Sequence, residues 1–354
     1  MKIWRVEGAT EEQAAAMIGE AAALLRSGGV VAFPTETVYG LGADATNEAA
    51  VERIFTAKGR PSDNPLIVHV ADKAQAEALI EECGPAARRL MERFWPGPLT
   101  LVLPLKPGAV ARRVTAGLDT VALRMPDHPL ARRLIAAAGC PVAAPSANRS
   151  GRPSTTTADH VLEDLNGRID GVLDGGPAGI GLESTVVRIT DGGGRIEVLR
   201  PGGITVEDLR AALPGAEIAV AAGLEASSEE APPSPGMKYK HYAPRGRLLV
   251  IRSSDPRRAA CRMQEELDRH KAQGETTGAL LFGAAESPVN ADVVVRCGHA
   301  RRPADIAREL YAALRRFDEA GATFIVAEAV SDEGLGLAIM NRLRRAAGDQ
   351  VMDV

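Results

Sequence analysis

Lys58 and Arg60 stand one residue apart in a glycine- and proline-containing loop segment, KGRPSDNP. A guanidinium offers a planar fork of donors and an ammonium a point charge, so the two cations can converge on one phosphate group. A solvated basic turn is the better explanation of a single K-x-R taken alone. The pair therefore predicts a phosphate site only if other polar segments share its surroundings.

Three further segments place polar residues next to apolar strands. Thr35, Glu36 and Thr37 follow the apolar run VVAF, and the segment APSANRSGRPS follows the apolar run at Val142. A third segment, GIGLEST, is a glycine-rich start to a strand, and its backbone N–H groups could bind an anion. Open α/β sheets bind ligands at strand ends. Capped or tight turns stay the alternative for the first and third segments, whereas the second has more polar groups than a surface turn needs.

Two arginines also belong to apolar strands. Arg124 lies inside the strand VALRM, where a buried arginine needs an anionic partner, and we favour a ligand carboxylate over an internal salt bridge. Arg200 ends another strand, and taken alone it is better explained as a surface charge. The acidic residues show no paired spacing typical of metal coordination, so any Mg²⁺ would arrive mainly with nucleotide phosphates.

The composition limits the classes of protein that these segments can serve. The 354 residues suggest about two domains, and 45% hydrophobic with 25% charged residues is ordinary for a globular protein with a real core. A formal net charge of −4 gives no global attraction to nucleic acid, and 3% aromatic residues leave little for a base-stacking platform. We find no signal peptide and no run that could span a bilayer, and we expect a cytoplasmic protein without membrane contact.

Several known kinds of site are excluded by missing motifs. The four cysteines lie far apart with no paired spacing, which argues against a disulfide framework and a zinc site. The chain has no G-x-x-x-x-G-K-[ST] phosphate loop. Residues 40–45 match G-x-G-x-x-A, but a dinucleotide fold needs an acidic residue about 20 positions further on, where this chain has the basic segment KGRPS.

Apolar periodicity predicts the elements that must hold these segments. Helices and short strands are mixed over about residues 1–215, which indicates an α/β domain. A stretch rich in Ser, Glu, Ala and Pro at 225–235 predicts a linker. Strands and helices alternate after it, which indicates a smaller, parallel, doubly wound domain. We therefore divide the chain into a first domain at 1–222, a linker at 223–245 and a second domain at 246–354.

Taken in order, the segments resemble the long form of the threonylcarbamoyl-AMP synthases. The stretches that carry the resemblance are FPTETVYGLG, KGRPSDNPLIVH, WPGPLTLVL, LRMPDHP, APSANRSGRPS, GLESTVV and LRPGG, followed by PGMKYKHYAP. They span about residues 29–244 and show no departure at the key positions. The resemblance implies an α/β fold with a YrdC-like open twisted sheet and helices, followed by a smaller Rossmann-like parallel α/β accessory domain.

The resemblance also implies a reaction and its partners. L-threonine, bicarbonate and ATP would give threonylcarbamoyl-AMP, pyrophosphate and water, which would make the chain a nucleotidyltransferase that uses Mg²⁺ with ATP. The product would pass to the machinery that transfers the threonylcarbamoyl group to an adenosine of tRNA. Direct contact between this chain and tRNA stays open.

Residue by residue, the resemblance implies two sets of site residues. The expected L-threonine residues are Thr37, His69, Arg124, Ala144 and Ser184. The expected ATP residues are Lys58, Arg60, Asn64, Thr120, Ser146, Asn148, Ser154, Arg200 and Tyr239. Lys58 and Arg60 are the expected catalytic residues, and Tyr239, in the linker, would close over the nucleotide. No residue is expected to ligate a metal directly.

Two other functions stay open at the level of the residues. An RNA-binding module with a basic cleft would explain the Lys and Arg residues of several loops, but the near-neutral charge and scarce aromatic residues weigh against it. Carbamoyl transfer in hydrogenase maturation uses a similar domain, normally with cysteine-rich zinc motifs that this sequence lacks.

Overall fold

The computed structural model describes residues 1–221, 241–283 and 289–354, which form two compact units. The N-terminal unit comprises Met1–Ser150, Thr155–Gly179 and Glu183–Tyr239. The C-terminal unit comprises Lys240–Val354 and two short segments from earlier in the chain, Gly151–Ser154 and Ile180–Leu182. Of the linker expected at 223–245, only 241–245 lie within the described residues.

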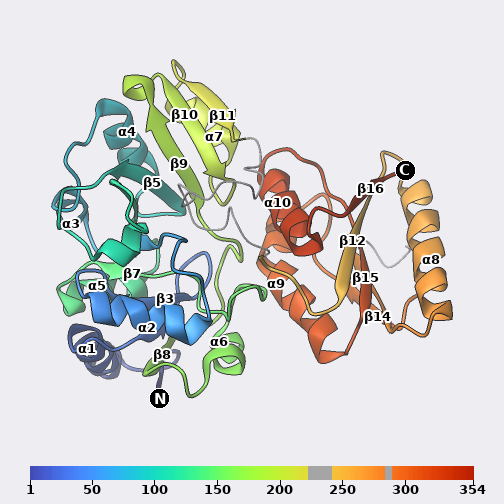
Figure 1. Cartoon of the computed structure of the whole chain (residues 1–354), viewed down its shortest axis with the longest axis horizontal. Helices are drawn as coiled ribbons and strands as arrows, with labels where there is room; N and C mark the ends of the chain where they lie inside the picture. The colour runs from blue at the N-terminus through green and yellow to red at the C-terminus, as the bar shows by residue number, and fades with distance from the viewer. Residues whose placement is uncertain (222–240, 284–288) are drawn as a thin grey trace. The chain divides into compact units, whose positions relative to one another are not determined.

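A twisted, eleven-stranded sheet organises the N-terminal unit, in the order β1-β8-β2-β3-β7-β4-β6-β5-β9-β10-β11 (Figure 1). Parallel pairs such as β4 with β6 occur beside antiparallel pairs such as β5 with β6. The expected α/β sheet with helices is therefore confirmed. The strands are β1 Lys2–Arg5, β2 Val31–Phe33, β3 Gly40–Asp44, β4 Ile67–His69, β5 Leu99–Pro104, β6 Thr120–Arg124, β7 Val142–Ala143, β8 Gly171–Asp174, β9 Thr185–Thr190, β10 Arg195–Arg200 and β11 Glu217–Val220.

The helices of this unit begin and end where the sequence supplies caps. Thr10 Oγ1 accepts from the Gln13 backbone and the Gln13 side chain accepts from the Thr10 backbone, so a complete capping box starts α1. Pro129 opens α5, where no intrahelical donor is needed, and Gly139 closes it at φ 68°. The helices are α1 Glu11–Arg26, α2 Glu48–Lys58, α3 Lys73–Glu77, α4 Pro85–Phe94, α5 Pro129–Ala138, α6 Ala158–Leu165 and α7 Val206–Ala212.

Alternating side chains divide the large sheet into two faces. One face carries the main core, where Val68 and Leu123 belong to a cluster with apolar residues of α2, α4, α6 and α7. On the opposite face, α1 and α5 lie side by side and cover the part of the sheet that includes β8, β2 and β7 (Figure 1). Phe33 and Val142 pack there with Ile135 of α5.

Beyond β7 the same face carries a small apolar cluster, the strand floor. Its buried members come from β4, β5, β6, β9 and β10, and none of the described helices contributes to it. Alternation along β4 and β6 places His69 and Arg124 on this face, two residues after members of the floor. This part of the sheet therefore presents polar side chains beside an apolar surface. The buried members of the strand floor are Ile67, Val102, Ala122, Val186 and Leu199.

The C-terminal unit is a five-stranded sheet between helices. Its order is β14-β13-β15-β12-β16, and every pair is parallel. α8 packs on one face through Met263 and Leu267, and α9 and α10 lie on the other (Figure 1). The expected smaller parallel α/β domain is therefore confirmed. Its elements are β12 Arg247–Arg252, α8 Pro256–Ala272, β13 Thr277–Leu281, β14 Val293–Arg296, α9 Pro303–Glu319, β15 Phe324–Glu328, α10 Leu335–Ala347 and β16 Val351–Asp353.

Four strands were not predicted from the sequence. β1, β11 and β16 are edge strands of their sheets, three or four residues long and partly exposed, so each gives only a short apolar signal. β3 is the segment that matches G-x-G-x-x-A. Gly42 serves close packing there, because a Cβ would lie 2.8 Å from side-chain atoms of both Phe33 and Val142.

None of the helices in the described ranges has the length and apolar character that crossing a membrane requires.

Candidate active site

Three of the residues expected to bind L-threonine lie on neighbouring strands. His69 and Arg124 end β4 and β6 and are register partners in this parallel pair. Each is 3% exposed. Ser184 directly precedes β9, whose first residue, Thr185, pairs with Leu99 at the start of β5. Since β5 also pairs with β6, the structure brings these three residues to the same end of adjoining strands.

Arg124 is held by three groups of the protein. Its Nη1 donates to Thr37 Oγ1 at 2.9 Å, and its Nε donates to the Gly97 carbonyl at 3.3 Å. Its Nη2 lies 2.7 Å from Glu36 Oε2. The internal salt bridge that we ranked second is therefore present, and a ligand carboxylate at Arg124 stays a prediction. A buried guanidinium without a counter-charge is costly, and Glu36, next to Thr37 in the chain, supplies one.

Burial keeps His69 uncharged. Its Nδ1 is inaccessible to solvent and has no hydrogen-bond partner, and its ring makes an edge contact with Phe33, with centroids 6.2 Å apart. Desolvation, and next the charge of Arg124, lower the pKa of His69 to about 3. At neutral pH one ring nitrogen is therefore a donor and the other an acceptor.

Ser184 is tied to Arg200 and Thr100. Its Oγ lies 2.7 Å from Thr100 Oγ1, and Arg200 Nη2 donates to the same Oγ at 3.2 Å and to the Ser184 carbonyl at 3.0 Å. All three residues are buried. Arg200 is therefore not the surface charge that its position in the sequence favours. It is a buried cation that fixes the turn before β9.

A second set of predicted residues surrounds Lys58. Its Nζ donates to the carbonyls of Ser146 and Asn148 at 2.6 and 2.5 Å, and Ser146 Oγ donates to Asn148 Oδ1 at 2.5 Å. Burial, and next the charge of Arg60, lower the pKa of Lys58 well below its usual range, while nearby carboxylates act in the opposite direction. The segments KGRPS and APSAN, distant in sequence, therefore meet at this ammonium.

Lys58 does not lie on a loop, as we expected. It is the last residue of α2, and Gly59 closes the helix at φ 65°. The side chain is buried because it reaches the base of the APSAN segment. Lys58 therefore has a structural role, in which it holds the APSAN segment, in addition to any catalytic role.

Arg60, Asn64 and Thr120 lie toward the other ends of β4 and β6. Arg60 Nη2 donates to the carbonyls of Asn64 and Pro65 at 3.3 and 3.1 Å. Asn64 is fully buried, yet neither its amide oxygen nor its amide nitrogen has a hydrogen-bond partner. Thr120 is the first residue of β6. Buried amides almost always have hydrogen-bond partners, so a ligand could supply the partners that the Asn64 amide lacks.

The two sets are separated by about the length of the short strands. Thr120 and Arg124 are the first and last residues of β6, which places their Cα atoms roughly 13 Å apart. Ala144 N donates to the Ile67 carbonyl at 2.9 Å, so Ser146 follows close to the start of β4. An extended molecule, such as a nucleotide joined to a small acid, could span this distance.

The remaining predicted residues fall in three places. Ala144 is buried in the apolar cluster under α1 and α5. Ser154 is fully buried and belongs to the segment Gly151–Ser154 of the C-terminal unit. Tyr239 lies outside the described residues.

Sequence reasoning assigned no ligand role to Glu36 or Thr100, which the structure places beside Arg124 and Ser184. A signal exists for each. Glu36 stands between two threonines directly after an apolar strand, and Thr100 is a hydroxyl that interrupts the apolar strand LTLVL. A polar residue that alternates with apolar ones on a buried strand faces a different environment from its neighbours.

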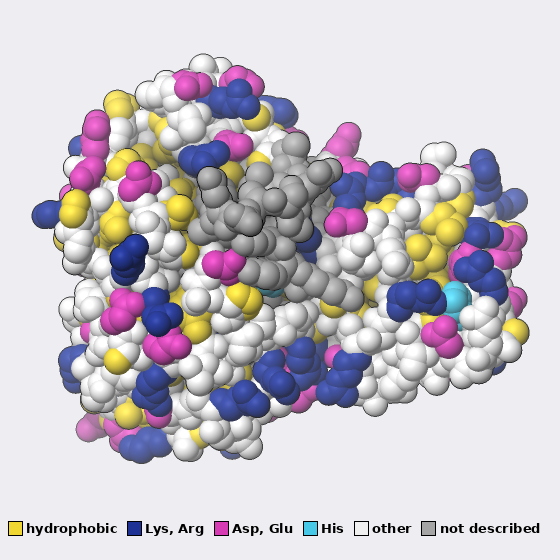
Figure 2. All heavy atoms as spheres, in the orientation of Figure 1, with side chains coloured by type: hydrophobic (Ala, Val, Ile, Leu, Met, Phe, Trp, Pro, Cys, Tyr) yellow, Lys and Arg dark blue, Asp and Glu magenta, His cyan; other side chains and the backbone are white. Residues whose placement is uncertain are grey.

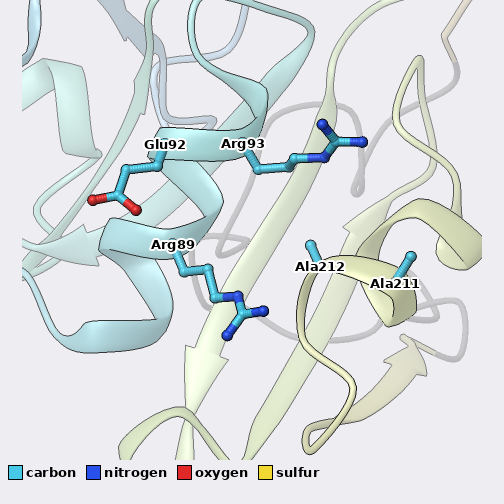
Figure 3. Close-up of a pocket in the computed structure, with 5 residues that line it drawn as sticks. All are labelled: Arg89, Glu92, Arg93, Ala211 and Ala212. Carbon is cyan, nitrogen blue, oxygen red and sulfur yellow. The ribbon is translucent and has the colours of Figure 1, made fainter.

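An open pocket of about 460 Å³ lies elsewhere in the N-terminal unit, between α4 and α7 (Figure 3). None of its lining residues was predicted as a site residue. On the face in Figure 2, Lys and Arg side chains occur together with Asp and Glu side chains, in keeping with a formal net charge of −4. The residues that line the pocket are Arg89, Glu92, Arg93, Ala211 and Ala212.

Comparison with known proteins agrees with this architecture. A family model of the Sua5, YciO and YrdC proteins, described as "Telomere recombination", matches residues 23–202. A second model, described as the C-terminal domain of threonylcarbamoyl-AMP synthase, matches residues 204–348. The threonylcarbamoyl-AMP synthase of Bacillus subtilis is 53% identical over 336 residues, which cover 95% of this chain and 94% of that protein. The chain belongs to the threonylcarbamoyl-AMP synthase family.

Two archaeal comparisons extend the relation to the threonylcarbamoyl-AMP synthase family. The threonylcarbamoyl-AMP synthase of Pyrococcus abyssi is 48% identical over 335 residues, which cover 94% of this chain and 95% of that protein. The crystal structure of P. abyssi Sua5 complexed with L-threonine matches at a TM-score of 0.90 and 44% identity, covering 100% of this chain and 99% of that chain. The predicted family and fold class are confirmed.

Proposed function

We propose that this chain forms threonylcarbamoyl-AMP and pyrophosphate from L-threonine, bicarbonate and ATP. The observation that carries the proposal is the pairing of two polar sets at opposite ends of β4 and β6, one around Lys58 and Asn64 and one around Arg124. Relatives that cover nearly all of this chain bear the name of this activity, and the related P. abyssi structure holds L-threonine.

The role of each residue follows from its charge and burial. Arg124 would bind the carboxylate of L-threonine, while uncharged His69 and Ser184 would form hydrogen bonds with its hydroxyl. A site that hydrogen-bonds a hydroxyl rejects an analogue without one far more strongly than an apolar pocket senses one methyl. Arg60 and Asn64 would bind the nucleotide and its phosphates, because they combine a cation with an unpaired amide.

The chemistry can proceed without a general base at the phosphorus. The amine of L-threonine loses a proton and adds to bicarbonate, which releases water and leaves a carbamate anion. An oxygen of this carbamate then forms a bond to the α-phosphorus, and the bond from that phosphorus to pyrophosphate breaks. The barrier comes from the repulsion between two anions that must meet. The positive charges of Lys58 and Arg60 reduce this repulsion and so lower the barrier. Positioning of the reactants can contribute up to roughly 7–11 kcal/mol.

Mg²⁺ belongs to the proposal as a companion of ATP. Within the residues described, no three His, Cys, Asp or Glu side chains gather to hold a metal ion. Mg²⁺ often binds through substrate phosphates and few protein ligands, and this set of residues fits that arrangement. When bound, it would neutralise phosphate charge, and Lys58 and Arg60 would remain the chain's own cations at the phosphates.

The proposed reaction also fixes the class of enzyme and its setting. Transfer of AMP to the carbamate makes the chain a nucleotidyltransferase. The adenylate would be consumed by an enzyme that transfers the threonylcarbamoyl group to tRNA, so we place the reaction in the cytoplasm, where ATP and tRNA are present.

The direct test is pyrophosphate release by the whole protein with ATP, Mg²⁺, bicarbonate and L-threonine. We expect release that requires L-threonine and stops when bicarbonate and dissolved CO₂ are removed. L-Valine, in which a methyl replaces the hydroxyl, should be a poor substrate. Release that proceeds equally without L-threonine would refute the proposal.

A further inference from the structure

Glu36 forms an unusual ion pair at the proposed L-threonine site. Its Oε2 lies 2.7 Å from Arg124 Nη2, and the two side chains are 13% and 4% exposed. Neither carboxylate oxygen has a hydrogen-bond partner, nor has Arg124 Nη2, and all three atoms are inaccessible to solvent. The contact is therefore a close approach of opposite charges that leaves the hydrogen-bonding capacity of both groups unused.

Such a pair is costly for a protein to bury. Desolvation of two charges is repaid only when the geometry is good and further hydrogen bonds satisfy the remaining donors and acceptors. The exposed pair of Lys2 and Glu20 has no such requirement, because water completes it. The pair of Glu36 and Arg124 lacks this completion inside the protein, which points to completion by a ligand.

The protein fixes the guanidinium but leaves its Nη2 without a hydrogen bond. Thr37 Oγ1 and the Gly97 carbonyl accept from Nη1 and Nε, so only Nη2 faces Glu36 without a hydrogen bond. A carboxylate with free acceptor oxygens and a guanidinium nitrogen with free donors thus lie side by side. This arrangement complements a molecule that carries one positive and one negative group close together.

We propose that Glu36 and Arg124 together bind the zwitterion of the α-amino acid: its carboxylate accepts from Arg124 Nη2, and its ammonium donates to Glu36. The inference rests on the proposed function, because it identifies the amino acid of that reaction as the ligand. Two charged groups of the substrate replace one internal contact that lacks hydrogen bonds with two hydrogen-bonded ion pairs. Glu36 is then a specificity-determining residue, and it places the amine beside a carboxylate before the carbamate forms.

This pairing predicts discrimination that Arg124 alone would not give. A hydroxy acid that lacks the amine would satisfy Arg124 but leave Glu36 buried with a second carboxylate nearby. The two neighbouring carboxylates, that of Glu36 and that of the hydroxy acid, would repel each other, and a buried charge left unpaired costs free energy. An ester of the amino acid would satisfy Glu36 and leave Arg124 without its anion.

The first test uses the unaltered protein and isothermal titration with three ligands: L-threonine, (R)-3-hydroxybutyrate, which lacks the amine, and L-threonine methyl ester, which lacks the carboxylate. We expect each one-charge analogue to bind roughly 10- to 100-fold more weakly than L-threonine, the range for loss of a hydrogen bond to a charged group. Equal affinity for L-threonine and (R)-3-hydroxybutyrate would overturn the inference.

The second test compares Glu36→Gln with a matched control, Glu92→Gln, an exposed residue of α4. Glu36→Gln should lose roughly 10- to 100-fold in affinity for L-threonine and should bind (R)-3-hydroxybutyrate at least as well as the unaltered protein does. The KM for ATP should not change. A folded variant that loses both ligands equally would show a structural role only and refute the inference, as would unchanged L-threonine affinity.

Failure of this inference and failure of the proposed function give different results. If L-threonine drives pyrophosphate release equally well in the unaltered protein and in Glu36→Gln, the function stands and the zwitterion site does not. If the unaltered protein selects the zwitterion but releases no pyrophosphate with ATP and bicarbonate, the site stands and the function does not.

Discussion

Buried polar residues of the N-terminal unit differ in whether the protein itself satisfies them. The ammonium of Lys58 and the hydroxyl of Ser184 have hydrogen-bond partners within the chain. The amide of Asn64 and the Nδ1 of His69 have none. Since an unpaired buried polar group costs free energy, the unsatisfied residues are those that a bound substrate should complete.

The pKa of His69 predicts a loss of stability in acid. Between pH 6.5 and about 3, the unfolded chain binds a proton at His69 that the folded chain does not bind. The free energy of unfolding should therefore fall by about 1.4 kcal/mol for each pH unit below 6.5, and His69→Gln should lack this part of the slope. Urea unfolding can be followed by fluorescence, because both tryptophans, Trp4 and Trp95, belong to the N-terminal unit. Equal slopes for the two proteins would contradict this prediction.

Asn64 predicts opposite effects on stability and on substrate binding. Asn64→Leu replaces a buried, unpaired amide with an apolar group of similar shape, so the free energy of unfolding should stay the same or rise by about 1 kcal/mol. The KM for ATP should rise at least about tenfold, since a hydrogen bond to a charged group is worth roughly 1.5–3 kcal/mol. Thermal unfolding and initial rates at varied ATP check both parts. A less stable variant with an unchanged KM would show that the amide is structural.

At the scale of elements, short strands and tight turns set the spacing of the site. β4 spans three residues and β6 five, so the polar sets at their ends stay within reach of one extended ligand. The turn after β10 lies against the turn before β9. A Cβ at Gly202 would lie 2.3 Å from Thr185 N and 2.4 Å from the Glu183 carbonyl. Gly202, the first glycine of LRPGG, is therefore required for the close approach between this turn and the segment that carries Ser184.

Gly202→Ala should therefore displace Ser184 from Thr100 and Arg200. We expect a loss of about 1–3 kcal/mol in the free energy of unfolding, as for other overpacked positions, and a raised KM for L-threonine. Gly215→Ala is the matched control, because no atom lies within 4 Å of a Cβ at that position. Circular dichroism during heating and rates at varied L-threonine measure the two effects. If both variants behave alike, the close approach has no consequence for the site.

At the scale of the whole molecule, the compact units do not follow the order of the chain. The segment Gly151–Ser154 belongs to the C-terminal unit, although it continues the APSAN segment of the N-terminal unit. Arg315 of α9 donates to the Pro153 carbonyl at 2.6 Å, and Ala243 N donates to the Gly151 carbonyl at 2.9 Å. The C-terminal unit therefore holds the segment that carries Ser154, a predicted ATP residue.

Arg315→Met should consequently lower the free energy of unfolding of the C-terminal unit. Arg315 is 1% exposed, and its loss would leave the Pro153 carbonyl without this donor. We expect a loss of about 1–3 kcal/mol, the cost of a buried acceptor left without its donor, measured by urea unfolding followed by circular dichroism. Arg316→Met, one residue further along α9 and exposed, is the matched control. Equal free energies of unfolding for Arg315→Met and Arg316→Met would contradict this prediction.

Local patterns in the sequence predicted much of the fold. The apolar runs of β2 and β6 and the linker composition at 225–235 act over a few residues, so their signals can be read without the fold. The edge strands were not predicted because they are short and partly exposed. Strand β3 was not predicted because its glycines are typical of a loop. The order of polar segments also indicated the family and the residues to examine.

The sequence by itself determined which segments are polar, which elements carry them and which family the chain resembles. Only the tertiary structure decided how those polar groups are paired. Arg124 meets Thr37 across 87 positions of sequence, and Lys58 meets Asn148 across 90. Such contacts depend on the order in which strands lie in the sheet, and periodicity along the chain encodes the burial of a residue without encoding its neighbour on the next strand. The ion pair of Glu36 with Arg124 was therefore invisible until the strands were assembled.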